Sequence, residues 1–108
     1  MGRFSTIALA EAAKLVASGE AQIADIRDPN AFATGHISGA FRLSNDNLGD
    51  FIAQADANQP VLVFCYHGIS SQNAGQYLAQ QGFAEVYSVD GGMVAWADTY
   101  PDQLEQDA

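Results

Sequence analysis

Apolar and polar residues follow one another in blocks along the chain, and the clearest block lies near its middle. Residues 61–64 (VLVF) form a short uninterrupted apolar run, which is typical of a strand buried on both faces of a parallel sheet. Residues 71–81 then carry apolar side chains at helical spacing, and Gly82 follows them as a glycine does at a helix end. Cys65 therefore stands where a central strand stops, just before a helix starts. In open α/β sheets, ligands bind at that edge.

The same pattern recurs on both sides of this block. We predict strands at 4–7, 21–26, 41–43, 61–64 and 85–89, helices at 8–18, 48–55, 71–81 and 93–100, and a short helix that starts at Asp28-Pro29. Residues 36–40 read as a turn, and Pro101 ends the last helix before an acidic tail at 102–108. Strands that alternate with helices predict an α/β fold: a mainly parallel five-stranded sheet with helices on both faces. The length predicts a single domain over 1–108.

Composition narrows the possible functions. With 48% hydrophobic residues among 108, the chain is predicted to be ordered. One cysteine and two histidines can form neither an internal disulfide nor a cysteine-rich zinc site, so we expect no metal and no cofactor. The net charge of −9, with four Lys and Arg residues, argues against a nucleic-acid partner. Because no segment resembles a signal peptide or a membrane span, we expect a reducing cytoplasm and no membrane partner. We also expect a monomer.

The position of Cys65 has chemical consequences. A short loop that curls into a helix start points several backbone N–H groups inward, and these groups and the helix dipole favour an anion. A free cysteine has a pKa of about 8.5, so only about 3% of it is thiolate at pH 7. A lowered pKa would make Cys65 a reactive nucleophile. The alternative is a buried structural cysteine, which is common in proteins.

Three motifs, in order along the chain, resemble those of the rhodanese family. Residues 25–28 (DIRD), Phe32 and residues 35–40 (GHISGA) resemble the N-terminal rhodanese signature, and residues 90–96 (DGGMVAW) resemble the C-terminal one. Between them, Cys65-Tyr66-His67-Gly68 followed by Ser70-Ser71 is similar to the cysteine loop of single-domain rhodaneses. Each motif is weak alone, but the three together span the whole chain in the expected order.

This resemblance implies a rhodanese-like fold and a thiosulfate sulfurtransferase activity. In such enzymes the cysteine thiolate takes the outer sulfur of thiosulfate, becomes a persulfide and releases sulfite. Cyanide or a dithiol protein of the thioredoxin type then accepts the sulfur, which gives ping-pong kinetics. The resemblance makes Cys65 the nucleophile, and we expect the persulfide to be held by the loop amides, which are those of Tyr66, His67, Gly68, Ile69 and Ser70. Four further residues are expected to support the loop: Ser71, Gln72, Asp25 and Arg27.

One departure from the family pattern leaves alternatives open. Rhodanese loops commonly carry Arg or Lys, whereas Ser70, Ser71 and Gln72 stand here and His67 is the only candidate cation of the loop. This departure predicts inefficient use of thiosulfate and keeps a persulfide carrier or binding module as an alternative. A phosphatase or arsenate reductase of the same fold is a weaker alternative, because such an enzyme needs a longer loop with Arg where Ser71 stands. Turnover with thiosulfate alone would separate an enzyme from a carrier.

Several other residues have a simpler structural interpretation. Asp25 and Arg27 are expected to pair and brace the strand end, although Arg27 could instead bind substrate. We expect His36 to be a turn residue that bonds backbone, Trp96 and Tyr100 to be core residues, and Gly91-Gly92 to permit a tight turn. His67 could pack in the loop or contact substrate. Ser71 could cap the following helix or contact substrate.

Overall fold

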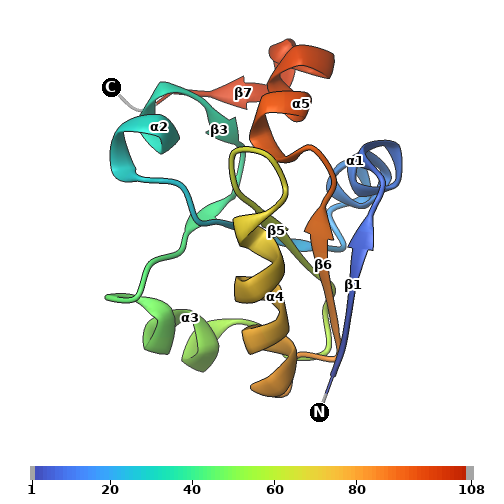
Figure 1. Cartoon of the computed structure of the whole chain (residues 1–108), viewed down its shortest axis with the longest axis vertical. Coiled ribbons are helices and arrows are strands. Elements are labelled where there is room, and N and C mark those ends of the chain that lie inside the picture. The colour runs from blue at the N-terminus through green and yellow to red at the C-terminus, as the bar shows by residue number, and fades with distance from the viewer. Residues whose placement is uncertain (1, 107–108) are drawn as a thin grey trace.

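The computed structural model describes residues 2–106 and has strands and helices in strict alternation along most of the chain. The elements are β1 (Arg3–Ile7), α1 (Leu9–Ser18), β2 (Gln22–Asp25), α2 (Pro29–Thr34), β3 (His36–Ile37), β4 (Phe41–Arg42), α3 (Leu48–Gln54), β5 (Val61–Phe64), α4 (Ser70–Gln80), β6 (Glu85–Val89), α5 (Gly92–Thr99), the 3₁₀ turn η1 (Pro101–Gln103) and β7 (Leu104–Glu105). Figure 1 shows their arrangement.

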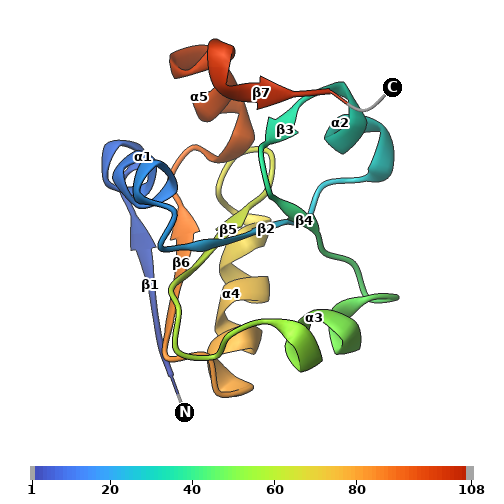
Figure 2. The ribbon, with the colours of Figure 1, turned by 180° about the vertical axis from the view of Figure 1, so that it is seen from behind.

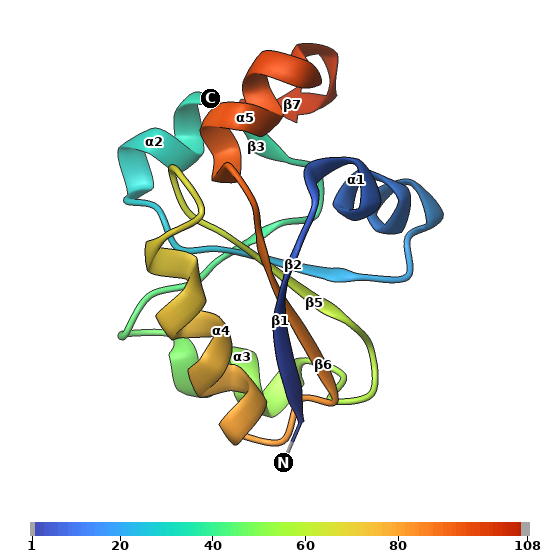
Figure 3. The ribbon, with the colours of Figure 1, turned by 45° about the vertical axis from the view of Figure 1, so that its right-hand side comes forward.

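Five of the strands form one parallel sheet in the order β1-β6-β5-β2-β4. The four residues of β5, at its centre, are all fully buried, as expected for a strand covered on both faces. Helices α3 and α4 cover one face of the sheet, and α1 and α5 cover the other (Figure 3). The predicted α/β fold with a five-stranded parallel sheet and helices on both faces is confirmed.

Each face of the sheet has its own apolar core. On the α3–α4 side, Phe51 and Leu78 pack with sheet residues such as Val63. On the α1–α5 side, Trp96 is fully buried and meets Phe64 edge to face, at 5.6 Å between ring centroids. Trp96 is therefore a core residue, as its helical spacing predicted. Residues of β5 pack into both cores, which holds in place the end of the strand that precedes Cys65.

The C-terminal segment differs from the prediction. Residues 104–105 were expected within an acidic tail and 36–40 as a turn, but β7 pairs antiparallel with β3 in a separate two-stranded sheet, as Figure 2 shows. The reason is one apolar residue among the acidic ones: Leu104 lies opposite the buried Ile37 and packs on the core beneath α5. The part of the predicted tail at 107–108 lies outside the described residues.

Candidate active site

Cys65 lies directly after β5, at the carboxyl end of the parallel sheet. We call residues 65–69 the cysteine loop; it joins β5 to α4, and Figure 1 shows it in yellow beneath α5. The Cys65 side chain is only 3% exposed. Two of its loop neighbours project outward instead, since Tyr66 is 42% and Ile69 73% exposed. A nearly buried sulfur thus lies in a loop that exposes two large apolar residues.

Two amide donors and one hydroxyl group lie around the Cys65 sulfur. The amide of Gly68 lies 3.1 Å from Sγ, the amide of Ser71 lies 3.3 Å from it, and the hydroxyl oxygen of Ser71 lies 3.2 Å from it. Ser71 is the second residue of α4, so its amide also carries the positive end of the helix dipole. This arrangement suits an anionic sulfur, because N–H and O–H groups donate more strongly to a charged acceptor.

Two of the candidate site residues reach Sγ through their amides: Gly68 from the loop and Ser71 from the first turn of α4. That the amides from Tyr66 to Ser70 hold a persulfide stays a prediction. Within the described residues, the amides of Tyr66, Ile69 and Ser70 make no hydrogen bond to this sulfur. The amides that face Sγ therefore come from both the loop, at Gly68, and the first turn of α4, at Ser71.

The pKa of the Cys65 thiol reflects two opposing effects. Burial, the larger single effect, raises the pKa, but hydrogen bonds from the Ser71 hydroxyl and from the amides of Ser71, Gly68 and His67 together outweigh it. The net result is a pKa below the usual value for cysteine. The site therefore favours the thiolate, which is the nucleophilic form of cysteine.

The shape of the cysteine loop depends on two glycines. Gly68 has φ +85°, and a Cβ there would lie 2.8 Å from the carbonyl oxygen of Val89. Gly92 has φ +59°, and a Cβ there would lie 2.5 Å from the carbonyl oxygen of Cys65. This approach lets the amide of Met93 donate to that oxygen at 2.7 Å. The Gly91-Gly92 pair thus does more than allow a turn, because it lets α5 dock on the cysteine loop.

Buried hydroxyl groups extend the site behind the sulfur. The α4 N-cap is Ile69, without a side-chain cap bond, so Ser71 does not cap the helix. Its hydroxyl instead lies 2.6 Å from that of Ser88, in β6, and both serines are fully buried. Gln72 supports the loop as expected, since its Nε2 donates to the carbonyl of Gly68 at 3.0 Å. Ser88 had not been expected at the site; the one signal was a serine inside an apolar strand.

Asp25 and Arg27 form a buried pair beside the loop. Arg27 Nη2 lies 2.7 Å from Asp25 Oδ2, Nε also contacts the carboxylate, and the two side chains are 8% and 1% exposed. Arg27 Nη2 also donates to the carbonyl of Gly35 at 2.8 Å. The guanidinium is therefore committed to joining the end of β2 to the segment after α2, which is the bracing role expected from the sequence.

The two histidines lie in different surroundings. His67, in the cysteine loop, is exposed. His36 is buried in β3, stacks on Phe32 with 3.9 Å between ring centroids, and has Nδ1 2.8 Å from the Phe32 carbonyl oxygen. It bonds backbone as predicted, but in a strand and not in a turn.

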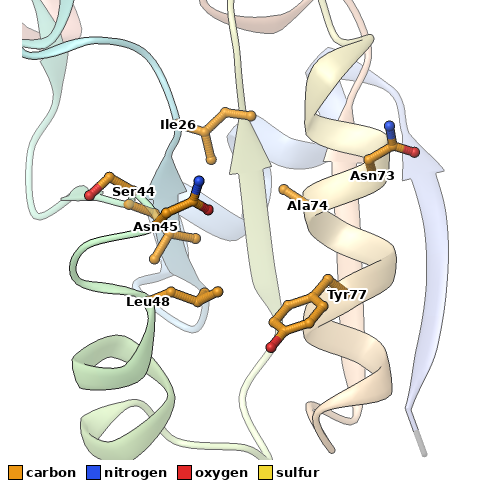
Figure 4. Close-up of a pocket in the computed structure, with 8 residues that line it drawn as sticks. Ile26, Ser44, Asn45, Leu48, Asn73, Ala74 and Tyr77 are labelled. Carbon is orange, nitrogen blue, oxygen red and sulfur yellow. The ribbon is translucent and has the colours of Figure 1, made fainter.

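A hollow of about 460 Å³ lies apart from the cysteine, between α4 and the segment that leads into α3 (Figure 4). Its lining is mostly apolar and includes Ile26, Leu48 and Tyr77. Cys65 does not line it, and Tyr77 is the only titratable residue that does. Residues 2–106 contain no group of three or more His, Cys, Asp or Glu side chains placed to hold a metal. None of the helices described is long and apolar enough to cross a membrane. We therefore take the cysteine loop, with its reactive thiol, as the candidate active site.

Comparison with known proteins gives consistent matches along the chain. The family model for the rhodanese-like domain matches residues 8–99. The thiosulfate sulfurtransferase GlpE of Stutzerimonas stutzeri is 55% identical over 97 residues, which cover 90% of this chain and 89% of that protein. The protein of the same name from Ectopseudomonas mendocina is 51% identical over 106 residues, 98% of this chain and 96% of the other.

Solved structures agree in fold. The crystal structure of a rhodanese-like domain protein from Staphylococcus aureus matches with a TM-score of 0.80 at 27% identity, covering 96% of this chain and 99% of that one. The likeness therefore extends over the whole sheet and its helices and is not limited to the cysteine loop.

Proposed function

This chain belongs to the family of rhodanese-like domains, and from that membership we propose that it is a thiosulfate sulfurtransferase that carries sulfur as a persulfide on Cys65. Relatives more than half identical to it bear that activity as their name. The observation that carries the proposal is the convergence of the Gly68 amide, the Ser71 amide and the Ser71 hydroxyl on one buried sulfur.

The first half-reaction loads the enzyme. The thiolate of Cys65 attacks the outer sulfur of thiosulfate, a new S–S bond forms, and the old S–S bond breaks with its electron pair leaving on sulfite. Sγ becomes neutral in the new S–S bond, the outer sulfur keeps a negative charge, and sulfite leaves as a dianion. The amides and the hydroxyl that surround Sγ stabilise the thiolate before the attack without reorganising, as preorganised donors do in other active sites.

The second half-reaction unloads the enzyme. An acceptor attacks the outer sulfur, and Sγ departs as the thiolate, which restores the starting state. With cyanide the product is thiocyanate; with a dithiol protein the sulfur passes to one thiol, and the second thiol can displace it as sulfide while a disulfide forms. Two successive displacements through one covalent intermediate predict ping-pong kinetics.

We propose a dithiol protein of the thioredoxin type as the acceptor, and exposed apolar residues near Cys65 support this proposal. Tyr66, Ile69 and Val94 are all large apolar residues that are 42%, 73% and 50% exposed, respectively. Val94 lies beside Tyr66, because it donates its amide to the carbonyl of Tyr66 at 3.0 Å, and Ile69 is the last residue of the same loop as Tyr66. We call these three residues the apolar rim. A protein acceptor that brings a thiol to Cys65 must contact this rim, whereas cyanide need not.

A persulfide carrier remains as a second candidate, and one observation favours it. The cysteine loop has no Arg or Lys, and the nearby guanidinium of Arg27 is paired with Asp25. Backbone amides and hydroxyls are then the main attraction for a dianionic donor. A carrier would accept sulfur from a partner protein and would turn over thiosulfate poorly.

Intact mass measurement after incubation with thiosulfate tests the proposal directly. We expect the wild-type chain to gain one sulfur atom and to lose it on addition of cyanide, with stoichiometric thiocyanate formed. Cys65→Ser is the matched control, since it removes the only thiol at nearly constant volume. No added sulfur on the wild type, or the same added sulfur on Cys65→Ser, would refute persulfide chemistry at this residue. Loading that occurs only in a single slow turnover would favour the carrier.

A further inference from the structure

Ser88 is a polar residue in an otherwise apolar place. It lies in β6 between β1 and β5, in register with Thr6 on one side and Val63 on the other, and is fully buried. Burial of a hydroxyl is unfavourable unless the group is hydrogen-bonded. Alanine or valine would fill this position in a sheet core without that cost, so the contacts of this hydroxyl indicate what it does.

Those contacts form a chain that ends on the reactive sulfur. Cys65 Sγ lies 3.2 Å from Ser71 Oγ, and Ser71 Oγ lies 2.6 Å from Ser88 Oγ. Ser88 Oγ in turn lies 3.5 Å from the carbonyl oxygen of Gly68. Each hydroxyl has one proton and can rotate, whereas the amides that face Sγ can only donate in one direction. The two hydroxyls are therefore the groups of the site that can change from hydrogen-bond acceptor to donor when the charge of the sulfur changes.

The hydrogen-bond chain from Cys65 through Ser71 to Ser88 has a consistent proton arrangement for each charge state of the sulfur. When Cys65 is a thiol, its S–H donates to Ser71, Ser71 donates to Ser88, and Ser88 points to the Gly68 carbonyl. When Cys65 is a thiolate, the proton has left to solvent, Ser71 donates to Sγ, and Ser88 donates to Ser71. The Gly68 carbonyl then keeps the Gln72 amide as its donor at 3.0 Å. In both states every proton of this hydrogen-bond chain has an acceptor.

We propose that Ser88 is a positioning residue for the sulfur chemistry, which acts through Ser71 by turning its hydroxyl toward the sulfur whenever the sulfur is anionic. The inference rests on the proposed function, because that function needs an anionic Sγ before attack and after release of the acceptor. The hydrogen-bond partners of the Ser88 hydroxyl are Ser71 and Gly68, so it acts on Sγ indirectly. Its effect reaches the sulfur only through the oxygen of Ser71.

The direction of the effect follows from hydrogen-bond strength. Loss of the Ser88 hydroxyl removes the Ser71–Ser88 bond in both states. In the thiolate state that bond polarises the charge-assisted bond to sulfur, and charge-assisted bonds are about twice as strong as neutral ones. The contact with Gly68, present only in the thiol state, is too long for a strong O–H···O bond. Removal of Ser88 should therefore disfavour the thiolate.

Other ionisable groups around the cysteine loop lie outside this chain of hydroxyls. After β2, Asp25 and Arg27 pair with each other, and Asp28 pairs with Tyr66 of the loop. His67 in the loop is exposed, as is Asp90 between β6 and α5, and Asp98 is the charged residue of α5. The causes that set the pKa of Cys65 are led by burial and by hydrogen bonds from Ser71. A change at Ser88 is thus expected to act through Ser71.

A double-mutant cycle read by alkylation tests the inference. The rate of alkylation by iodoacetamide against pH gives the pKa of Cys65, and no other thiol can react because the chain has one cysteine. We expect Ser88→Ala to raise that pKa by about half a unit to one unit, which lowers the rate below neutral pH about three- to tenfold. In a Ser71→Ala background, the same Ser88→Ala change should have no effect.

The control and the contrary outcomes are well defined. Thr6→Val removes a hydroxyl from the strand that pairs with β6 at this position and should leave the pKa unchanged. Equal shifts for Ser88→Ala in both backgrounds, no shift, or a downward shift would overturn the proposal. Ser88→Thr keeps the hydroxyl and should restore the wild-type pKa if Ser88→Ala proves unstable. Alkylation needs no sulfur transfer, so this result stands apart from the success or failure of the proposed function.

Discussion

The phenol of Tyr66, in the cysteine loop, donates a 2.7 Å hydrogen bond to Oδ2 of Asp28. Oδ1 of the same carboxylate accepts from the amide of Ala31 and caps helix α2. One aspartate therefore joins the reactive loop to the helix that follows β2. The bond from the Ala31 amide and that from Tyr66 lower the pKa of Asp28, and the pKa of Tyr66 is raised chiefly by the bond to Asp28.

Tyr66→Phe should release this tie without disturbing the helix cap. We expect the pKa of Asp28 to rise in the variant, and sulfur transfer to slow by about two- to fivefold as the loop loses one restraint. Because the folded pKa of Asp28 is lowered, its contribution to stability is present above its usual pKa and is lost as pH falls through the folded value. The variant should lose less stability in acid than the wild type does.

Carboxyl NMR titration of Asp28 and thermal unfolding at several pH values would measure both effects. Tyr87→Phe is the matched control, since Tyr87, the middle residue of β6, likewise donates its phenol to a carboxylate, that of Glu85 at the start of the strand. Equal slowing of sulfur transfer in the two variants would show that the Tyr66–Asp28 bond has no special role.

The Asp25–Arg27 pair should matter for stability first. Arg27→Ala would leave a carboxylate that is 1% exposed without its partner, and breaking a buried pair in this way costs about 3–5 kcal/mol. We expect urea denaturation to give a loss of this size and activity to fall with the folded fraction. Lys14→Ala breaks the exposed pair with Glu11 and should change stability by less than about 1 kcal/mol. A fully stable Arg27→Ala with a strongly raised KM for thiosulfate would instead place Arg27 in the substrate site.

The architecture could be predicted from the sequence because its signals are local. The apolar run of β5 and the proline and aspartate at the start of α2 each act over a few residues, and all appear where expected. The short strands β3 and β7 lacked such a signal. Their pairing depends on Leu104 and Ile37, which are 67 positions apart in numbering, and a single leucine in an acidic segment does not mark a strand.

Part of the geometry around Cys65 could also be predicted from the sequence. The strand–loop–helix pattern identified Cys65 and the loop as a cradle for an anion, and the Gly68 amide lies where that argument put it. Ser88 could not be found in this way, because its relation to Ser71 arises from the order β6-β5 in the sheet and the position of α4 on it. The role of Gly92 likewise depends on contact between two loops that are distant in sequence.

The lowered pKa of Cys65 predicts a specific pH dependence. Since the thiolate is favoured in the folded state, the midpoint of alkylation against pH should lie below about 8.5, the usual pKa of cysteine. Between the folded and the unfolded pKa, the unfolded chain binds more protons, so stability should rise with pH across that range and be independent of this group below and above it. Cys65→Ala should lack this dependence in denaturant titrations. An alkylation midpoint at or above the usual value would refute the cradle argument.

Ile69 should distinguish large acceptors from small ones. It is the most exposed residue of the apolar rim, and Ile69→Ser would remove apolar contact area that only a protein acceptor can cover. We expect KM for a thioredoxin-type acceptor to rise about tenfold, with the cyanide reaction unchanged. Tyr77→Gln, which alters another exposed large residue, 43% exposed and within α4, should affect neither. A parallel loss with cyanide would mean that Ile69 shapes the loop and does not contact the acceptor.

The last prediction concerns the charge of the donor. Thiosulfate is a dianion, the chain carries a net charge of −9, and the cysteine loop has no Arg or Lys. Repulsion between separated charges is screened over a Debye length of about 10 Å at 0.1 M salt. We therefore expect kcat/KM for thiosulfate to rise with moderate salt, measured with a salt whose anion does not bind at the loop. A steep fall would show that local attraction already outweighs the global charge.

A lysine placed at the loop distinguishes the effect of a local charge on the donor from the effect of the net charge of the protein. Gln72 lies in the first turn of α4 and contacts the Gly68 carbonyl, so Gln72→Lys adds a cation beside the site. Gln80→Lys changes the net charge equally, but eight residues, or about 12 Å, farther along the helix. We expect about a tenfold gain in kcat/KM for the first variant, which needs about 1.4 kcal/mol, and little gain for the second. The gain should appear mainly in KM, because a cation there holds the bound donor as well as the transition state. Equal gains in both variants would mean that net charge alone limits the approach of the donor, and no gain in either would mean that the amides and hydroxyls around Sγ already suffice.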